Sequence, residues 1–317
     1  MSVKQQCFEH IIVGALMPLF NAKITPHQYA SVEKRGQVAC MRTIQKWVCE
    51  ENRRKANAKK YGRRYTGKCS SFVKLDVTQC FPSITTATVM CFLRHDITKN
   101  DELLWAVEAI LKTHEVGGRG LVIGSLLSQF VCNYLLSYVY RYAMALHVEQ
   151  DGKQVKAVTH GLFFMDDILM TGSNPDHLRE AVSSVIKYAK DTIGLTVKPN
   201  WHVKTLDDEP IDMMGYVVHA DGHVTIRARI FLRTRRAYLR ANRRTIDVKC
   251  ARRLMAYNGY LVHTATHELR ERLNVKKIRR IARRIIRKHD RKEKMLHDER
   301  YPVYRGAGSC RVVGTSA

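Results

Sequence analysis

Residues 161–172 read GLFFMDDILMTG, in which the apolar runs GLFF and ILMT are separated only by Met165, Asp166 and Asp167. This spacing predicts a β-hairpin whose turn carries two acids. Adjacent carboxylates repel each other, and such a pair commonly lies in a plain surface turn where water relieves the repulsion. The nearly all-apolar flanking runs indicate instead a hairpin that is embedded in a core.

A third acid, Asp76, lies near the end of another apolar stretch, SFVKLDV at residues 71–77. Aspartates at two buried strand ends cost free energy unless cations lie beside them. Ligands that are all oxygen favour Mg²⁺ over zinc. Two such ions about 3.5–4 Å apart clamp an in-line phosphoryl displacement, so these residues point to nucleotidyl transfer.

The charge of the chain favours a polyanionic partner. Its 317 residues include 54 Lys and Arg against 29 Asp and Glu, a net charge of +25, and 45% are hydrophobic. This composition excludes general disorder, and the length favours two compact lobes with a tail. Nucleic acid is the leading partner, and a soluble basic enzyme or a ribosome-associated protein is the alternative. The nine cysteines include no C-x-x-C pair, which is typical of reduced thiols in a cytoplasmic protein.

The order of the expected elements indicates an α+β fold with a small antiparallel sheet and helices on one face. The elements are a strand at 71–77, helices from about residue 86, at 101–114 and at 175–193, a turn at 117–120, a strand at 195–205 and a hairpin within 211–230 that turns at 220–222. The basic run 52–68 lacks apolar periodicity and predicts a loop or a fraying helix end. Its role is left open between a solvated spacer and a contact to phosphates.

Residues 121–146 contain one charge, Arg141, and are long enough to span a bilayer. Polar residues recur at positions 125, 129, 133 and 137, however, and form one stripe on an otherwise apolar helix. A buried helix with one face on a working site fits this pattern better than a membrane span. Residues 1–19 also lack the order of a signal peptide, so no membrane association is expected.

The C-terminal third is the most basic part of the chain. From residue 215 to 317 there are 27 Lys and Arg against 8 Asp and Glu, so this segment contributes +19 of the total net charge of +25. A helix over 266–295 is expected, with an apolar stripe of Ile278, Ile281 and Ile285 together with Ala282 and Ile286. Its other face carries Arg279, Arg280, Arg283, Arg284, Arg287 and Lys288. Like charges at this spacing destabilise a free helix, so we expect an anion to lie along them.

Three segments in order resemble motifs A, B and C of reverse transcriptases: KLDVTQCFPSI (74–84), GLVIGSLLSQFVCNYLLS (120–137) and FMDDILMTG (164–172). Further segments resemble the fingers (27–36), motif D (195–201), the primer-grip hairpin (212–230) and the thumb of bacterial members (250–280). The resemblance implies a right-hand polymerase fold. Its expected parts are a fingers segment at 1–70, a palm at 71–226, a basic helical thumb at 227–297 and a flexible tail at 298–317.

Within that family, the segment from Ile123 to Gln129 resembles the diversity-generating retroelement branch, because most members have Gln before the motif B glycine. That branch copies a template RNA into cDNA with errors opposite adenine and works with a small basic oligomeric accessory protein. A phage-defence reverse transcriptase that makes DNA on a non-coding RNA is the alternative. A non-catalytic RNA-binding scaffold is a third possibility, against which the intact aspartates argue. Phe164, where Tyr is common, and Cys80 depart from the family pattern conservatively.

The resemblance also implies roles for the metal-binding residues. Asp76 and Asp166 would bind two Mg²⁺ ions, for which Mn²⁺ can substitute, and the Val77 carbonyl would complete the metal shell. Asp167 would support one ion or the primer end, or would only stabilise the hairpin. Lys198 would neutralise or protonate the leaving pyrophosphate, or would be a plain surface lysine.

The remaining roles concern the incoming dNTP and the template RNA or RNA–DNA duplex. Phe81 would lie under the sugar and exclude a 2′-hydroxyl, unless it is only a core aromatic, and Arg35 would contact the triphosphate. Gly124 would let the backbone approach the template base pair, and Gln129 would face the site or, with Asn133, only cap a buried helix. Ile123 would touch the nucleotide or simply pack the helix start.

Overall fold

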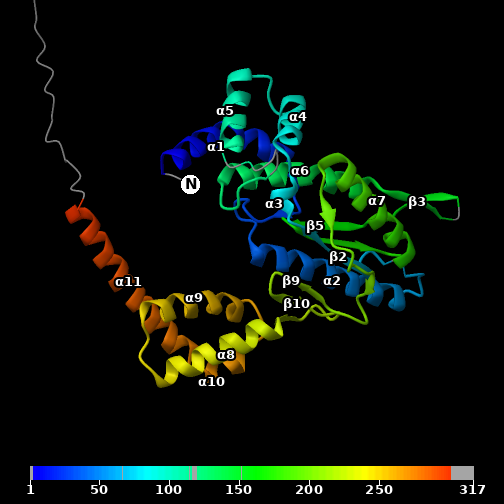
Figure 1. The fold of residues 1–317 in the computed structure, drawn as a ribbon. Coiled ribbons are helices and arrows are strands. Elements are labelled where there is room, and N and C mark those ends of the chain that lie inside the picture. The colour runs from blue at the N-terminus through cyan, green and yellow to red at the C-terminus, as the bar shows by residue number, and fades with distance from the viewer. Residues whose placement is uncertain (1–2, 66, 114, 116–119, 151, 301–317) are drawn as a thin grey trace, which may run out of the picture. The chain divides into compact units, whose positions relative to one another are not determined.

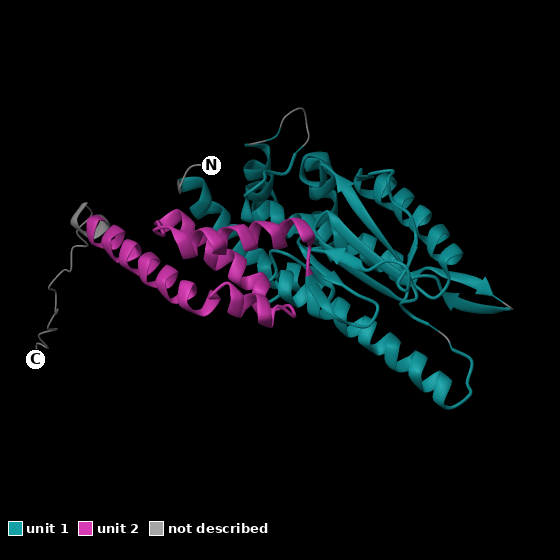
Figure 2. Cartoon of the chain, turned by 90° about the horizontal axis from the view of Figure 1, so that it is seen from below, with its two compact units in different colours: residues 1–225 teal, residues 226–317 magenta. Residues whose placement is uncertain are grey.

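The computed structural model describes residues 3–65, 67–113, 115, 120–150 and 152–300, which form two compact units, residues 1–225 and 226–317 (Figure 2). Unit 1 contains α1 (Val3–Lys23), β1 (Gln28–Tyr29), α2 (Gln37–Lys60), β2 (Ser71–Thr78), α3 (Cys80–Ser83), α4 (Thr86–Asp96), α5 (Asp101–Lys112), α6 (Leu126–Ala145), β3 (His147–Gln150), β4 (Lys153–Lys156), β5 (His160–Phe164), β6 (Asp167–Gly172), α7 (Pro175–Ile193), β7 (Thr196–Val197), β8 (Lys204–Thr205), β9 (Ile211–Met213), β10 (Tyr216–Val218) and, up to the boundary, β11 (Val224–Ile226). Among the described residues, no helix is both long and apolar enough to cross a bilayer.

The main sheet of unit 1 has the strand order β1-β5-β6-β2-β7, and β8 also pairs with β2 (Figure 1). Strands β5 and β6 form the predicted hairpin, and β2 lies antiparallel to β6. Because side chains alternate across a strand, β2 and β6 each present one apolar row to the core that surrounds α6. The α+β class expected from the sequence is therefore confirmed.

Helices cover both faces of the sheet, and the expectation of helices on one face is wrong. Phe163 of β5 packs edge-on against Tyr140 of α6, with ring centroids 5.5 Å apart. His160, three residues earlier and therefore on the opposite face, stacks on Trp47 of α2 at 4.6 Å. The sequence did not predict this second layer, because the basic run 52–68 lacks apolar periodicity although α2 continues through it as far as Lys60.

Two further expectations for unit 1 need correction. The strand predicted over 195–205 is two short strands, β7 and β8, separated at Pro199 and Asn200. The hairpin predicted within 211–230 is present as β10 and β11, but β9 pairs with β10 as a third strand and residues 228–230 begin α8. The predicted turn at 220–222 is present, and it docks on α2, where Asn52 Nδ2 donates to the Ala220 carbonyl at 2.7 Å. The expected turn at 117–120 lies outside the described residues except for Gly120.

The polar stripe of α6 mainly contacts N-terminal elements of the chain rather than a functional site. Ser125 caps the helix and donates to the buried Glu9 of α1, and Asn133 Nδ2 donates to the Ala30 carbonyl at 3.0 Å. Ser137 accepts from Arg141 at 2.8 Å. Ser125 and Asn133 therefore fix α6 against α1 and the segment after β1, and Ser137 holds Arg141, which donates to the Lys23 carbonyl at the end of α1. This corrects the functional interpretation of these three positions.

Unit 2 is a helical body that packs around its own core. It contains α8 (Ala228–Arg243), α9 (Val248–Val262), α10 (His267–Arg272) and α11 (Val275–Arg300). The core comprises Ile226, Tyr238, Leu254, Leu261, Leu273, Val275 and Ile278. The single helix predicted over 266–295 is broken at Asn274, whose φ of 51° is left-handed.

The predicted apolar stripe of α11 holds only in part, because Ile278 and Ala282 are buried whereas Ile281 is 40% exposed. Residues 298–300 continue α11 and do not begin a tail. The rest of the predicted tail, 301–317, lies outside the described residues.

Candidate active site and nucleic-acid interface

Three aspartates meet at one end of the main sheet. Asp76 of β2 is directly opposite Asp167 of β6 in the antiparallel register. Asp166 lies in the two-residue turn between β5 and β6, and its carbonyl accepts from the Val77 amide at 2.9 Å. The turn requires a φ of 53° at Met165, whose side chain is buried. The cost of this left-handed residue is offset by anchoring the turn in the core.

Two lysines neutralise the carboxylates of this site. Lys198 Nζ lies 2.7 Å from Asp76 Oδ2, and Lys74 Nζ lies 3.1 Å from Asp167 Oδ1. Lys198 was predicted as a site residue, whereas Lys74 was not. The signal was present, because Lys74 and Asp76 are two apart on one strand and so share a face.

Charge and burial perturb the titration of the site. Burial, together with the negative charges of Asp167 and Asp76, raises the pKa of Asp166. The hydrogen bond to Asp76, reinforced by the charges of Asp166 and Asp167, raises the pKa of Lys198. The cluster holds three carboxylates against the two paired lysines, an excess of one negative charge, so it favours added cations.

The segment before α6 lies beside the predicted nucleotide-binding aromatic. The Leu121 amide donates to the Phe81 carbonyl at 2.9 Å, and the Gly120 amide donates to the Ile84 carbonyl at 3.1 Å. Phe81 is partly buried against the core. Gly124 has a φ of 94°, which favours glycine, and its neighbour Ile123 is 79% exposed. The alternative that Ile123 packs the helix start is therefore wrong.

Arg35 and Gln129 are not brought into contact with the aspartates. Arg35 Nη1 donates to the Thr25 carbonyl at 2.6 Å and so closes the loop that follows β1. That loop begins beside the β5–β6 hairpin, because Tyr29 of β1 pairs with Phe164. Gln129 is half-buried on α6. Nucleotide contacts by these two residues stay predictions.

The reverse transcriptase (RNA-dependent DNA polymerase) family matches residues 1–218, which include all three aspartates. The chain belongs to the reverse transcriptase family. RNA-dependent DNA polymerisation is the activity by which this family is described, and it is the activity that the sequence predicts. No curated protein matches the chain significantly in sequence.

Solved structures with a similar fold include telomerases of Candida tropicalis. The apo telomerase has a TM-score of 0.52 at 12% identity, covering 88% of this reverse transcriptase and 49% of the telomerase chain. The telomerase in complex with the TWJ fragment of telomeric RNA has a TM-score of 0.50 at 10% identity, and the match covers 91% of this chain and 47% of the telomerase chain. This reverse transcriptase thus spans about half the length of these chains, and the likeness concerns the fold.

Unit 2 of the reverse transcriptase presents a strongly basic surface on α11. Arg279, Arg280, Arg283, Arg284, Arg287 and Lys288 line one concave surface of about 800 Å³. In the described part of the chain, none of these six has a carboxylate within 4.0 Å, and Asp290 and Glu293 of α11 pair with Arg252 and His289 instead. Unpaired cations on one face are available to an anionic partner.

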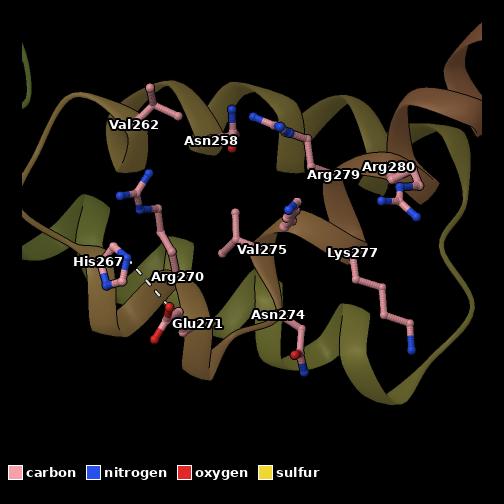
Figure 3. A pocket seen from close by; sticks show the side chains of 11 residues that line it. Asn258, Val262, His267, Arg270, Glu271, Asn274, Val275, Lys277, Arg279 and Arg280 are labelled. Carbon is pink, nitrogen blue, oxygen red and sulfur yellow. Dashed lines mark ion pairs between the residues drawn. The ribbon is translucent and has the colours of Figure 1, made fainter.

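A second cavity of unit 2, about 700 Å³ in volume, lies between α9, α10 and the start of α11 (Figure 3). Arg270, Lys277, Arg279 and Arg280 line it, and Glu271 is engaged by His267 at 3.6 Å. The buried Arg270 Nε and Asn258 Oδ1 have no hydrogen-bond partner among the described residues. Polar atoms of this kind favour a ligand that supplies the missing hydrogen bonds.

Proposed function

We propose that this reverse transcriptase copies a dedicated template RNA into cDNA by two-metal nucleotidyl transfer, with reduced fidelity, as part of a diversity-generating retroelement. The observation that carries the catalytic part is the opposition of Asp76 and Asp167 in register, with Asp166 in the adjoining turn. Three carboxylates on one rigid sheet end supply the charge and the oxygen ligands that this chemistry needs.

The donor set fits divalent cations of the Mg²⁺ or Mn²⁺ kind. Asp76, Asp166 and Asp167 offer only oxygen, and their three negative charges exceed the two positive charges of Lys74 and Lys198. Bound ions would neutralise the charge that develops on the reacting phosphate. The hydrogen bond to Asp76 raises the pKa of Lys198, so this lysine would stay protonated and would neutralise the leaving pyrophosphate.

The nucleotide would lie against Phe81, Ile123 and Gly124, whose segments are hydrogen-bonded to each other. An aromatic ring under the sugar would exclude a 2′-hydroxyl, and Arg35 would contact the triphosphate. Unit 2 would be the thumb and α11 would hold the RNA–DNA duplex by its phosphates, because the six unpaired cations match a phosphate backbone. A small basic oligomeric accessory protein would complete the assembly.

The exposed aliphatic side chain of Ile123 supports the error-prone branch, because it cannot hydrogen-bond a base pair. The test is to supply the purified chain with a primed RNA, dNTPs and Mg²⁺ or Mn²⁺, and to sequence the cDNA. The retroelement role requires templated cDNA whose errors concentrate opposite adenine. Repetitive or untemplated DNA would favour the phage-defence alternative, and no incorporation would leave only the RNA-binding scaffold.

A further inference from the structure

The basic run 52–68 contributes to a cavity of about 770 Å³ in unit 1 that the polymerase reaction does not use. The cavity lies where the loop after α2 meets the β3–β4 hairpin and the start of α7. Its cationic lining residues are Arg64, Lys68, Lys153 and Lys156, and none of its described lining residues is acidic. We propose that this surface, here called the loop–hairpin cleft, binds an unpaired strand of RNA through its phosphates.

The loop that forms one wall is held rigidly. The buried Glu51 of α2 accepts a hydrogen bond from the Tyr65 hydroxyl through Oε1. Its Oε2 accepts another from the Lys68 amide at 3.0 Å. Thr159, just before β5, donates to the Lys68 carbonyl. A Cβ at Gly67 would meet Glu51 Oε1 at 2.6 Å, so a larger residue there would displace the Glu51 carboxylate from its position in the loop. A preorganised wall of this kind lowers the entropic cost of binding.

The four cations of the cleft are not neutralised by the protein. No carboxylate in the described part of the chain lies within 4.0 Å of them, although acids nearby are engaged elsewhere. Lys55 pairs with Asp207 at 2.8 Å, and Lys204 pairs with Glu209. Four cations at one concavity repel each other, and a phosphate backbone would relieve that repulsion.

An unpaired strand fits better than a duplex because of Tyr61, at the end of α2, which does not line the cleft but precedes its lining residue Arg64 by three positions. Its ring is 59% exposed and is flanked by Lys60 and Arg63, whose charged groups lie 5.3 and 5.6 Å from its centroid. An exposed aromatic ring among cations provides a stacking surface for a base, and only unpaired bases offer a free face. The Thr159 and Ser173 hydroxyls in the cleft can bond a ribose 2′-hydroxyl.

The cleft is separate from the catalytic aspartates. Asp76 and Asp167 lie at one end of β2 and β6, whereas Lys68 precedes β2 and Ser173 follows β6 at the other end. Five steps of about 3.3 Å along β6 place the two sites roughly 17 Å or more apart. The bound strand would therefore lie outside the base pairs formed at the aspartates, an inference that rests on the proposed use of a dedicated RNA.

The test measures whether the full chain binds two nucleic acids at once. The protein is first saturated with an RNA–DNA primer–template duplex, and a short labelled oligouridylate is then titrated in. The quadruple variant R64Q/K68Q/K153Q/K156Q should bind the oligouridylate at least about 10-fold more weakly at 0.1 M salt, and its salt slope should fall by about 3. Its duplex affinity and its incorporation on a short primed template should not change.

The matched control neutralises one arginine and three lysines elsewhere in unit 1, R94Q/K99Q/K187Q/K190Q, all exposed. It should change oligouridylate binding by less than about 2-fold. A further variant, Y61A, should weaken binding about 5-fold or more without changing the salt slope. Equal losses in both quadruple variants, or complete displacement of the oligouridylate by the duplex, would overturn the proposal. Failure of the proposed function would appear separately, as absent incorporation by the wild type.

Discussion

The aspartates of unit 1 and the arginines of α11 place like charges in two different ways. Asp76, Asp166 and Asp167 are held by strand register and by a left-handed residue in a buried turn, so each occupies a unique position. The cations of α11 follow one exposed helix face, where neighbours one turn apart are nearly equivalent. The first arrangement specifies the positions of individual carboxylates. The second produces a positive electrostatic field to which many side chains contribute.

The largest effect should follow from a single change in unit 1. Asp166→Asn removes a metal ligand and should lower nucleotide incorporation by about 10³-fold or more, equivalent to about 4 kcal/mol. It also removes repulsion from Asp76 and Asp167, so Tm should rise, by about 1 °C or more. Steady-state incorporation and calorimetry measure the two effects. Asp191→Asn on the exposed surface of α7 is the matched control and should change neither. Near-normal incorporation by Asp166→Asn contradicts the two-metal assignment.

The second test asks whether the cations of α11 act together through one electrostatic field or through individual contacts. Reversing Arg279, Arg280, Arg283 and Arg284 to Glu should weaken binding to an RNA–DNA duplex by roughly 100-fold at 0.1 M salt, nearly regardless of sequence. Reversing Arg283 alone should cost less than about 5-fold, because its neighbours compensate. Filter binding across a salt series measures both. If one reversal costs as much as four, α11 makes a specific contact; an unchanged duplex affinity at low salt makes it a protein-docking face.

The same contrast explains what the sequence could predict. The hairpin with Asp166 and Asp167 was predictable because apolar alternation and a short acidic turn are local signals. Lys74 could have been identified from its position two residues before Asp76, but its pairing with Asp167 depends on the register of two distant strands. The docking of the 220–222 turn on α2 also depends on contacts between distant segments, which local patterns do not report. The stripe on α6 was misjudged for that reason: periodicity identifies a polar face but not the element that it meets.

Helix α2 is a second case. Its basic C-terminal half has no apolar stripe because it extends beyond the core, so the pattern predicted a loop where the helix persists to Lys60. The break of the basic helix at Asn274 was also missed, because both of its sides continue the same helical period. Tertiary contacts decide such positions: Asn242 Nδ2 donates to the Leu273 carbonyl at 3.0 Å, at the break.

A smaller effect concerns the acid sensitivity of unit 1. Burial, reinforced by the nearby charge of Lys68, lowers the pKa of His160 to about 4, whereas an unfolded histidine titrates near about 6.5. The unfolded chain therefore binds the proton first as pH falls, and stability should decrease by about 1–2 kcal/mol between pH 6.5 and pH 4. His160→Phe keeps the stack on Trp47 and should reduce this loss in thermal melts across pH. The exposed His202→Phe should leave the loss intact, and equal profiles for both variants would assign the acid sensitivity to other groups.

The smallest expected effect is on fidelity, at Ile123. A polar amide there could hydrogen-bond the sugar or the edge of the neighbouring base pair, and so tighten the geometric test for correct pairing. The aliphatic side chain, 79% exposed beside the segment bonded to Phe81, leaves shape alone to discriminate. One hydrogen bond is worth roughly 0.5–1.5 kcal/mol, about a 2- to 12-fold gain in discrimination if only the correct pair makes it. Other residues must therefore contribute to any gross infidelity.

Ile123→Gln should accordingly lower the error frequency of the cDNA within that range, with the largest gain opposite template adenine. Because the side chain is exposed, the substitution opens no cavity, and Tm should stay within about 1 °C of the wild type. Ile123→Val, which trims the side chain without adding a donor or acceptor, is the control and should keep the wild-type error spectrum. Sequencing cDNA from the three proteins on one template decides the matter. If Ile123→Gln and Ile123→Val give the same error spectrum, a hydrogen bond at this position does not affect fidelity. The case for the retroelement branch over the defence branch then weakens.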